Sequence, residues 1–244
     1  MKKTILCTLV FLFVAGLAAV SLNAQTVQQV MDKMIEAQGG RAAMEAVKDS
    51  TYSGTAELIQ FGMNGTFTMY HKEPDFFRLD MEMMGMVITQ AYDGQVAWWV
   101  NPQTGTDELM NEQQTADLKR QALGNDALFN PAKYGITYEL KPKEKIGDKE
   151  YIVLDQVFKD GFKSTMYLDP DTYLVYKTKA KTQSQAGTEV MAESFMTDYE
   201  KDQGLVVAKS INILQDGQEF MRLKISKAVF NSGLEDQLFK RTGK

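Results

Sequence analysis

The sequence predicts an α+β protein that is mainly β, in which a strongly curved antiparallel sheet holds N-terminal helices in its concave face. Two observations predict this class. Apolar residues recur with a helical period near the N-terminus, and from residue 51 onward they alternate with polar residues over segments of strand length. Turn dipeptides such as Asn64-Gly65 and Asp93-Gly94 separate these segments, and such turns favour hairpins between antiparallel neighbours.

The first 24 residues have the layout of a secretory signal peptide. A short basic start precedes the largely apolar residues 5–22, and Ala24 supplies a small residue for cleavage. We therefore expect cleavage after about Ala24, which leaves residues 25–244 as one exported domain. The apolar run is marginal for a membrane span, so an uncleaved anchor is the alternative, and no span is expected in the mature protein.

Composition excludes several classes of function. Without residues 1–24 the chain has 25 basic and 32 acidic residues, a net charge of −7, which does not suit nucleic acid. Cys7 is lost with the signal peptide, so disulfides, thiol catalysis and zinc–thiolate sites are excluded. His71 is the one histidine of the sequence. Because phosphate loops, nucleophile elbows and EF-hand spacings are also missing, we expect no enzyme, no metal and no cofactor.

Helical patterns predict two N-terminal helices. In residues 26–38 the apolar positions share one helical face, Thr26 and Gln29 have the spacing of a capping box, and Gly39 ends the helix. A second, shorter helix is expected over residues 41–48. Both helices have an apolar stripe to bury, and the concave face of the sheet is the economical place for it.

Alternating segments predict about twelve strands, and the turns between them predict a largely meandering antiparallel sheet. A single open sheet of that size must curl or close, so a closed, lipocalin-like barrel is the alternative architecture. The expected strands cover residues 51–60, 64–71, 76–83, 86–92, 95–100, 136–142, 150–158, 163–169, 173–180, 188–199, 205–214 and 219–229.

One helical segment interrupts the strands. Residues 111–123 have Asn111 in the position of an N-terminal cap and are followed by Gly124 as a stop. The apolar face of this segment is thin, with Leu118 near its centre. We therefore expect the helix to lie on the surface or to act as a lid.

Methionine is the feature that points to binding. The chain without Met1 has 14 methionines, and Met81, Met83, Met84 and Met86 lie close together. Flexible thioether side chains suit adaptable apolar binding surfaces, although they also fill the core of a wide sheet. If no bulge shifts the alternation, one apolar face forms over consecutive strands and becomes the candidate lipid site. Its candidate residues are Phe67, Met69, Phe77, Leu79, Met81, Met83, Ile88, Val96 and Trp98.

The two tryptophans are neighbours in an expected strand. Trp98 and Trp99 should therefore point to opposite faces of the sheet. With one of them inside, the other is either covered by a helix or loop or available to a partner.

Several segments resemble bacterial outer-membrane lipoprotein-sorting proteins, the lipoprotein carrier family, between about residues 26 and 240. The segments that carry the resemblance are 36–40 (EAQGG), 91–98 (AYDGQVAW), 167–174 (YLDPDTYL) and 231–239 (NSGLEDQLF).

The resemblance implies a half-barrel closed by helices around an apolar cavity, and a periplasmic carrier of lipids or acylated lipoproteins. We expect the protein to be a monomer. A protein sheath suits such cargo because each buried methylene is worth about 0.8 kcal/mol. The family's carriers use an arginine on an early strand that faces the cavity. The strands expected at 51–60 and 64–71 have none, and Arg78 falls on the polar phase, which favours a broader lipid-binding role. The alternatives are an envelope scaffold with a filled cavity and an enzyme inside a barrel.

Overall fold

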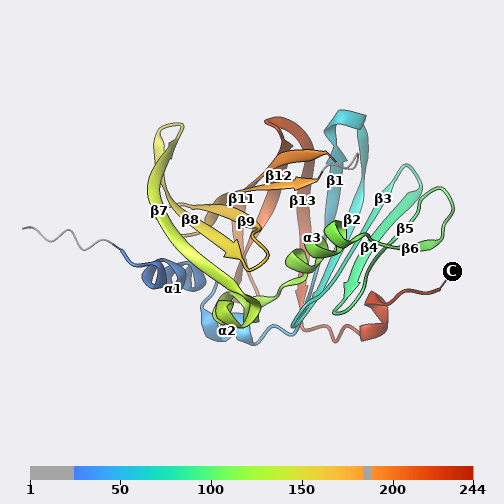
Figure 1. Cartoon of the computed structure of the whole chain (residues 1–244), viewed down its shortest axis with the longest axis horizontal. Coiled ribbons are helices and arrows are strands. Elements are labelled where there is room, and N and C mark those ends of the chain that lie inside the picture. Colours follow the sequence, from blue (N-terminus) through green and yellow to red (C-terminus); the bar gives the residue numbers. More distant parts are fainter. Residues whose placement is uncertain (1–24, 184–187, 244) are drawn as a thin grey trace, which may run out of the picture.

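Antiparallel pairing joins the strands into one sheet (Figure 1). The computed structural model describes residues 25–183 and 188–243, so the expected signal peptide lies outside it. Within the described residues the sheet has 13 strands in the order β6-β5-β4-β3-β2-β1-β13-β12-β11-β10-β9-β8-β7. The strands are β1 Asp49–Leu58, β2 Met63–Lys72, β3 Phe76–Met83, β4 Met86–Asp93, β5 Ala97–Val100, β6 Asp107–Leu109, β7 Ile136–Ile146, β8 Lys149–Phe158, β9 Lys163–Leu168, β10 Val175–Gln183, β11 Glu189–Asp202, β12 Leu205–Gln215 and β13 Gln218–Phe230.

The sheet consists of two series of neighbouring strands that meet at the β1–β13 pair. Strands β1 to β6 follow one another on one side of this pair, and β13 back to β7 follow on the other. β6 and β7 form the two edges, so the sheet is open and curved, as the sequence predicts, and is not a closed barrel. The register of the β1–β13 pair shifts between Ser53 and Gly54.

The helices lie near the predicted positions. The capping box at the start of α1 is present, because the Thr26 hydroxyl accepts from Gln29 N at 3.2 Å and the Gln29 side chain accepts from Thr26 N at 2.9 Å. Asn111 caps α3 in the same way. The described helices are α1 Val27–Ala37, α2 Arg41–Glu45, η1 Ile59–Phe61, α3 Glu112–Ala122, α4 Asn125–Phe129, η2 Pro131–Tyr134 and η3 Asp236–Phe239.

The strand register divides the sheet into two faces of different character. The face that carries Ala56, Phe67 and Leu154 is called the apolar face here, and the face that carries Thr55 and Lys224 is the polar face. Directly opposed residues of neighbouring strands point to the same side, so this division can be followed across the sheet.

Two helices pack on opposite ends of the apolar face. Val30 and Met34 of α1 are buried against Leu154 and Leu168 at the β8–β9 end. Leu118 of α3 is 2% exposed and packs at the β3–β5 end, between the two groups of strands in Figure 1. The helix expected to be a surface element or a lid therefore covers part of the sheet with a small, fully buried stripe.

The C-terminal segment after β13 fastens onto the molecule through hydrogen bonds. The carboxylate of Asp49 accepts from Ser232 N at 2.7 Å and from Gly233 N at 2.9 Å. Further along, η3 covers the polar face over β3–β5, where the fully buried Phe239 makes an edge-to-face contact with Phe76.

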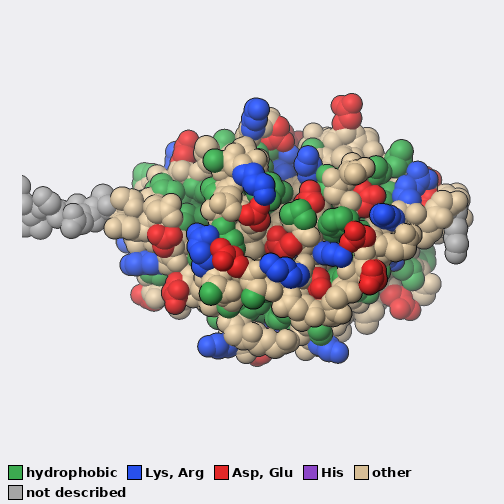
Figure 2. Space-filling model, turned by 90° about the horizontal axis from the view of Figure 1, so that it is seen from below, with side chains coloured by type: hydrophobic (Ala, Val, Ile, Leu, Met, Phe, Trp, Pro, Cys, Tyr) green, Lys and Arg blue, Asp and Glu red, His purple; other side chains and the backbone are tan. Residues whose placement is uncertain are grey.

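Charged side chains of both signs are interspersed on the side of the molecule shown in Figure 2. None of the helices in residues 25–183 and 188–243 is long and apolar enough to cross a membrane.

Candidate functional site

The middle of the apolar face, between the areas covered by α1 and α3, carries a continuous group of large apolar side chains. We call this group the central apolar patch. Its buried members lie on four neighbouring strands, and the remaining side chains around them are only partly buried. The patch comprises Tyr52, Ala56, Leu58, Met63, Phe67, Met69, Leu79, Met81, Met83, Ile211, Met221, Leu223 and Ile225.

Five of the nine predicted site residues belong to this patch, and Ile88 lies beside them on the same face. Phe67 lies directly opposite Met81, which lies opposite Ile88, so these three side chains form one row over β2, β3 and β4. Met69 and Leu79 form the next row. Met83 is the last residue of β3 and is fully buried at the margin of the patch. Phe77 shares the face but packs beneath α3, against Leu118 and Ala122.

The remaining two predicted residues do not belong to this face. Trp98 lies opposite Ala91, on the polar face, where its indole Nε1 donates to Phe239 O at 2.8 Å. Val96 precedes β5 and is 38% exposed in the turn that the Asp93 side chain stabilises. Trp99 is the tryptophan on the apolar side, opposite Gln90. The placement of Trp98 and Val96 with the other site residues was therefore wrong, because β5 begins at Ala97 and Ala97 pairs with Tyr92, which puts Ala97 and Trp99 on the apolar face.

The far half of the patch was not assigned from the sequence. Met221, Leu223 and Ile225 alternate along β13, and Ile211 lies opposite Leu223 on β12. The alternation of Met221, Leu223 and Ile225 was visible in the sequence. The sequence does not show that β13 pairs with β1, because no local turn joins these two strands.

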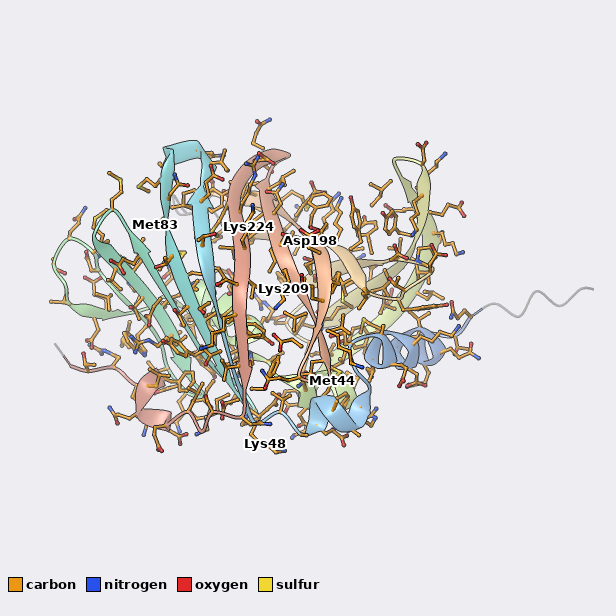
Figure 3. All side chains as sticks on the ribbon, turned by 180° about the vertical axis from the view of Figure 1, so that it is seen from behind. Met44, Lys48, Met83, Asp198, Lys209 and Lys224 are labelled. Carbon is orange, nitrogen blue, oxygen red and sulfur yellow. The ribbon has the colours of Figure 1, made fainter. Side chains whose placement is uncertain are left out.

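The patch ends at hairpin tips that expose large apolar side chains. Met84 and Met86, in and after the β3–β4 turn, are 76% and 46% exposed, and Phe61 at the β1–β2 turn is 57% exposed. Figure 3 shows the buried Met83 at this end of the sheet, far from Met44 and Lys48 at the other end. The apolar surface is therefore continuous from the middle of the sheet to its rim.

A small cavity lies at the opposite end of the strands. It has a volume of about 320 Å³, is open to solvent, and is lined by the ends of β1, β2 and β12 together with α2, α4 and the residues that follow α3. His71 donates from Nε2 to Gln121 O at 3.3 Å, and burial lowers the pKa of its imidazole. Glu73 accepts from Asn125 N at 2.6 Å, and burial raises the pKa of its carboxyl. These contacts fix the α3–α4 connection to the end of β2.

Arg78 lies on the polar face, as its position in the alternation predicts. Its Nε donates to both carboxylate oxygens of Asp80 at 3.0 Å, and its Nη1 donates to Leu238 O at 2.7 Å. The guanidinium therefore secures the C-terminal segment and does not face the central apolar patch. Within residues 25–183 and 188–243 there is also no group of three side chains placed to hold a metal ion.

Solved structures with the same fold identify the architecture. No protein-family model and no curated protein matches the sequence. A domain described as an outer membrane lipoprotein-sorting protein domain, from Vibrio parahaemolyticus, matches with a TM-score of 0.58 and 14% identity over 88% of this chain and 97% of that one. A LolA superfamily protein from Nitrosomonas europaea matches with a TM-score of 0.59 and 15% identity over 89% of this chain and 99% of that one.

A third structure, a DUF1329 family protein from Desulfovibrio piger, matches with a TM-score of 0.59 and 16% identity over 89% of this chain and 98% of that one. These likenesses extend over nearly the full length of each chain. They confirm, at the level of the fold, the resemblance that the sequence segments indicated.

Proposed function

We propose that this chain, which has the fold of outer-membrane lipoprotein-sorting proteins, is an exported periplasmic carrier that shields the acyl chains of lipids or lipoproteins on its central apolar patch. The observation that carries the proposal is the partial burial of that patch. Met69, Leu79, Met81, Met221 and Leu223 are packed on one side and remain accessible on the other. An acyl chain is the natural partner of such a surface.

The energetics of the patch suit reversible binding. Each methylene that leaves water for an apolar surface contributes about 0.8 kcal/mol, so an acyl chain gains affinity in small, additive steps. Four methionines of the patch, Met63, Met69, Met81 and Met221, have flexible thioether side chains that can repack around chains of different shape. Contacts of this kind favour release to an acceptor without an energy source.

The position of α1 supports a carrier more than a scaffold with a filled interior. The buried side of α1 packs on β8 and β9 through Val30, Met31 and Met34, at one end of the apolar face. It does not cover the row formed by Phe67 and Met81. We further propose that cleavage after about Ala24 yields a monomer of residues 25–244, which acts by binding and not by catalysis.

The test is to express the full chain with its signal peptide, purify the exported protein from the periplasm and record native mass spectra, followed by solvent extraction. Co-purified phospholipid or acylated peptide would support the proposal and identify the cargo class. A fluorescent fatty-acid probe is then titrated into delipidated protein. No co-purified lipid together with no probe binding would reject the carrier and favour a scaffold.

The variant Met81→Asp places a charge in the middle of the central apolar patch and should abolish most lipid uptake. The reason is that contact with an acyl chain does not compensate the free energy lost when a carboxylate is desolvated. The control is Thr55→Asp, which places the same charge on the polar face opposite Lys224. Equal loss of probe binding in both variants would mean that the patch is not the site.

A further inference from the structure

The central apolar patch and the small cavity at the other end of the strands lie on the same face of the sheet. Tyr52 and Met69 are directly opposed on β1 and β2 and form the last row of the patch. The next row along these strands consists of Ser50 and His71, which line the cavity, and Tyr52 lines it as well. Because every second residue of a strand points to the same side, the patch leads directly into the cavity.

Two hydroxyl groups lie at the point where the patch meets the cavity. Ser50 is 6% exposed, and its hydroxyl lies close to that of Tyr52. Burial raises the pKa of the Tyr52 phenol, so this hydroxyl keeps its proton. Since a hydroxyl group both donates and accepts, this pair can exchange hydrogen bonds with the hydroxyl groups of a ligand.

The imidazole of His71 adds a hydrogen-bond acceptor. Its Nε2 donates to Gln121 O at 3.3 Å, and burial lowers its pKa, so the ring is neutral at pH 7. A neutral imidazole that donates from Nε2 has a lone pair on Nδ1. In the part of the chain that the structure describes, no side chain or backbone group donates to this Nδ1. One acceptor is therefore left for a ligand.

The charged groups around the cavity already have partners within the protein. Asp49 and Glu73 accept hydrogen bonds from backbone N–H groups. The ammonium group of Lys48, which is labelled in Figure 3, donates to Glu45 O at 2.9 Å. Two acidic residues and one lysine line the cavity, so its lining has a formal charge of −1 and does not suit an anion.

We propose that the cavity binds the uncharged, hydroxyl-bearing head group of a lipid, such as glycerol, while the acyl chain of this lipid lies on the central apolar patch. Ser50 and Tyr52 exchange hydrogen bonds with the head-group hydroxyls, and His71 accepts one. The volume of about 320 Å³ is at the lower end of the range of about 300 to 1,000 Å³ for ligand pockets, which suits a small head group. This inference rests on the carrier function proposed above and specifies its cargo as a glycerol ester of a fatty acid.

The experiment compares three ligands with the same lauroyl chain, namely monolauroylglycerol, methyl laurate and laurate. Each is titrated into the delipidated exported protein, and binding is followed by ligand-observed NMR. Monolauroylglycerol should bind at least about tenfold more tightly than methyl laurate, the effect expected of the additional hydrogen bonds. Laurate should bind more weakly than monolauroylglycerol, because its carboxylate meets a lining of negative formal charge.

Two variants test the cavity without changing the patch. Ser50→Ala removes one hydroxyl and should lower the preference for monolauroylglycerol over methyl laurate by about fivefold. The control is Ser53→Ala, the same substitution on the polar face of β1, which should keep the preference. Val207→Trp fills the cavity from β12 and should remove the preference. Methyl laurate should bind all these proteins equally, which also shows that they are folded.

The possible results separate this proposal from the carrier function. A preference for monolauroylglycerol that persists in either Ser50→Ala or Val207→Trp would overturn the proposal, as would equal affinities of the two esters for the native protein. Tighter binding of laurate than of both esters would overturn it as well. In each of these cases the carrier function stands, because the acyl chain still binds. Failure of all three ligands to bind would reject the carrier and this proposal together.

Discussion

Asp107 connects the C-terminus to the short edge strand β6 through one buried carboxylate. Its Oδ1 accepts from Arg241 Nη2 at 2.8 Å, and its Oδ2 accepts from Thr242 N at 2.9 Å and from Gly243 N at 2.8 Å. The hydrogen bonds from Arg241 are the largest cause that lowers the pKa of Asp107 to about 2. The charged form is therefore the one that holds the last residues in place.

This pKa leads to a prediction about acid stability. Because the pKa is 3.8 without these partners and about 2 in the folded protein, the carboxylate stabilises the fold above pH 3.8, and this contribution is lost as the pH falls towards 2. Asp107→Asn should lower the free energy of unfolding at pH 7, and its deficit against the native protein should shrink below pH 3.8. Urea titrations of both proteins at several pH values measure this. A deficit that is constant down to pH 2 would contradict it.

The face of the sheet on which Trp98 lies depends on the register between β4 and β5. The turn before β5 is closed by the Asp93 side chain, which accepts from Gln95 N at 3.0 Å and from Val96 N at 2.7 Å. These bonds take Val96 out of the strand and place Trp98 on the polar face. Local alternation alone predicts the period of the strand but not its phase, so the face of these two residues was not predictable from the sequence.

Among the elements, α3 is attached to the sheet by a small area. Leu118 and Ala122 are its fully buried side chains, and they pack on Phe77, Tyr92 and Ala97. The other side of the helix carries Arg120, which donates to Asp160 at 2.6 Å and stacks on the Phe162 ring. Docking of α3 therefore depends on a few apolar contacts, whereas each strand is held by a ladder of hydrogen bonds.

Leu118→Ala should undock α3 while the sheet stays folded. Loss of a buried leucine side chain costs ~3 kcal/mol, which corresponds to roughly 100-fold faster hydrogen exchange for amides protected by docking. Exchange measured by mass spectrometry should rise in residues 112–122 and stay unchanged in β12. The control is Gln113→Ala, an exposed position on the same helix. Equal acceleration in β12 would show that α3 and the sheet unfold together.

Element positions were largely predictable because their signals are local. The expected strand at 76–83 has the observed bounds of β3, and the capping boxes of α1 and α3 begin where the sequence indicates. β6 was missed because three residues, Asp107 to Leu109, are too short to show an alternation. The helix η3 was missed as well, since residues 236–239 form it only by packing on the β3–β5 part of the sheet.

At the scale of the whole molecule, the β1–β13 pair joins the two strand series into one sheet. At Gly54 the two backbones approach so closely that a Cβ atom would lie 1.8 Å from Lys224 O. The register of the pair shifts at the same point, between Ser53 and Gly54. The absence of a side chain at Gly54 is therefore a condition for the junction of the two series.

Gly54→Ala should destabilise the entire protein by about 3 kcal/mol or more, because either β1 or β13 must shift and every strand beyond the junction is affected. Ser53→Ala, one residue earlier in β1, is the control and should cost little. Thermal unfolding followed by far-UV circular dichroism measures both. A melting temperature of Gly54→Ala equal to that of Ser53→Ala would show that the junction tolerates a wider spacing.

The pairing of β1 with β13 also has a consequence for the order of events in synthesis. During synthesis β1 is made first and β13 last. One edge of β1 therefore stays uncovered until β13 has been made, since Ser50 pairs with Phe230. Contacts between such distant parts of a chain slow folding and leave strand edges open to aggregation in the meantime. A nascent chain of this protein therefore cannot complete its sheet early, and protection of the β1 edge by a holding chaperone becomes valuable until the C-terminus is released.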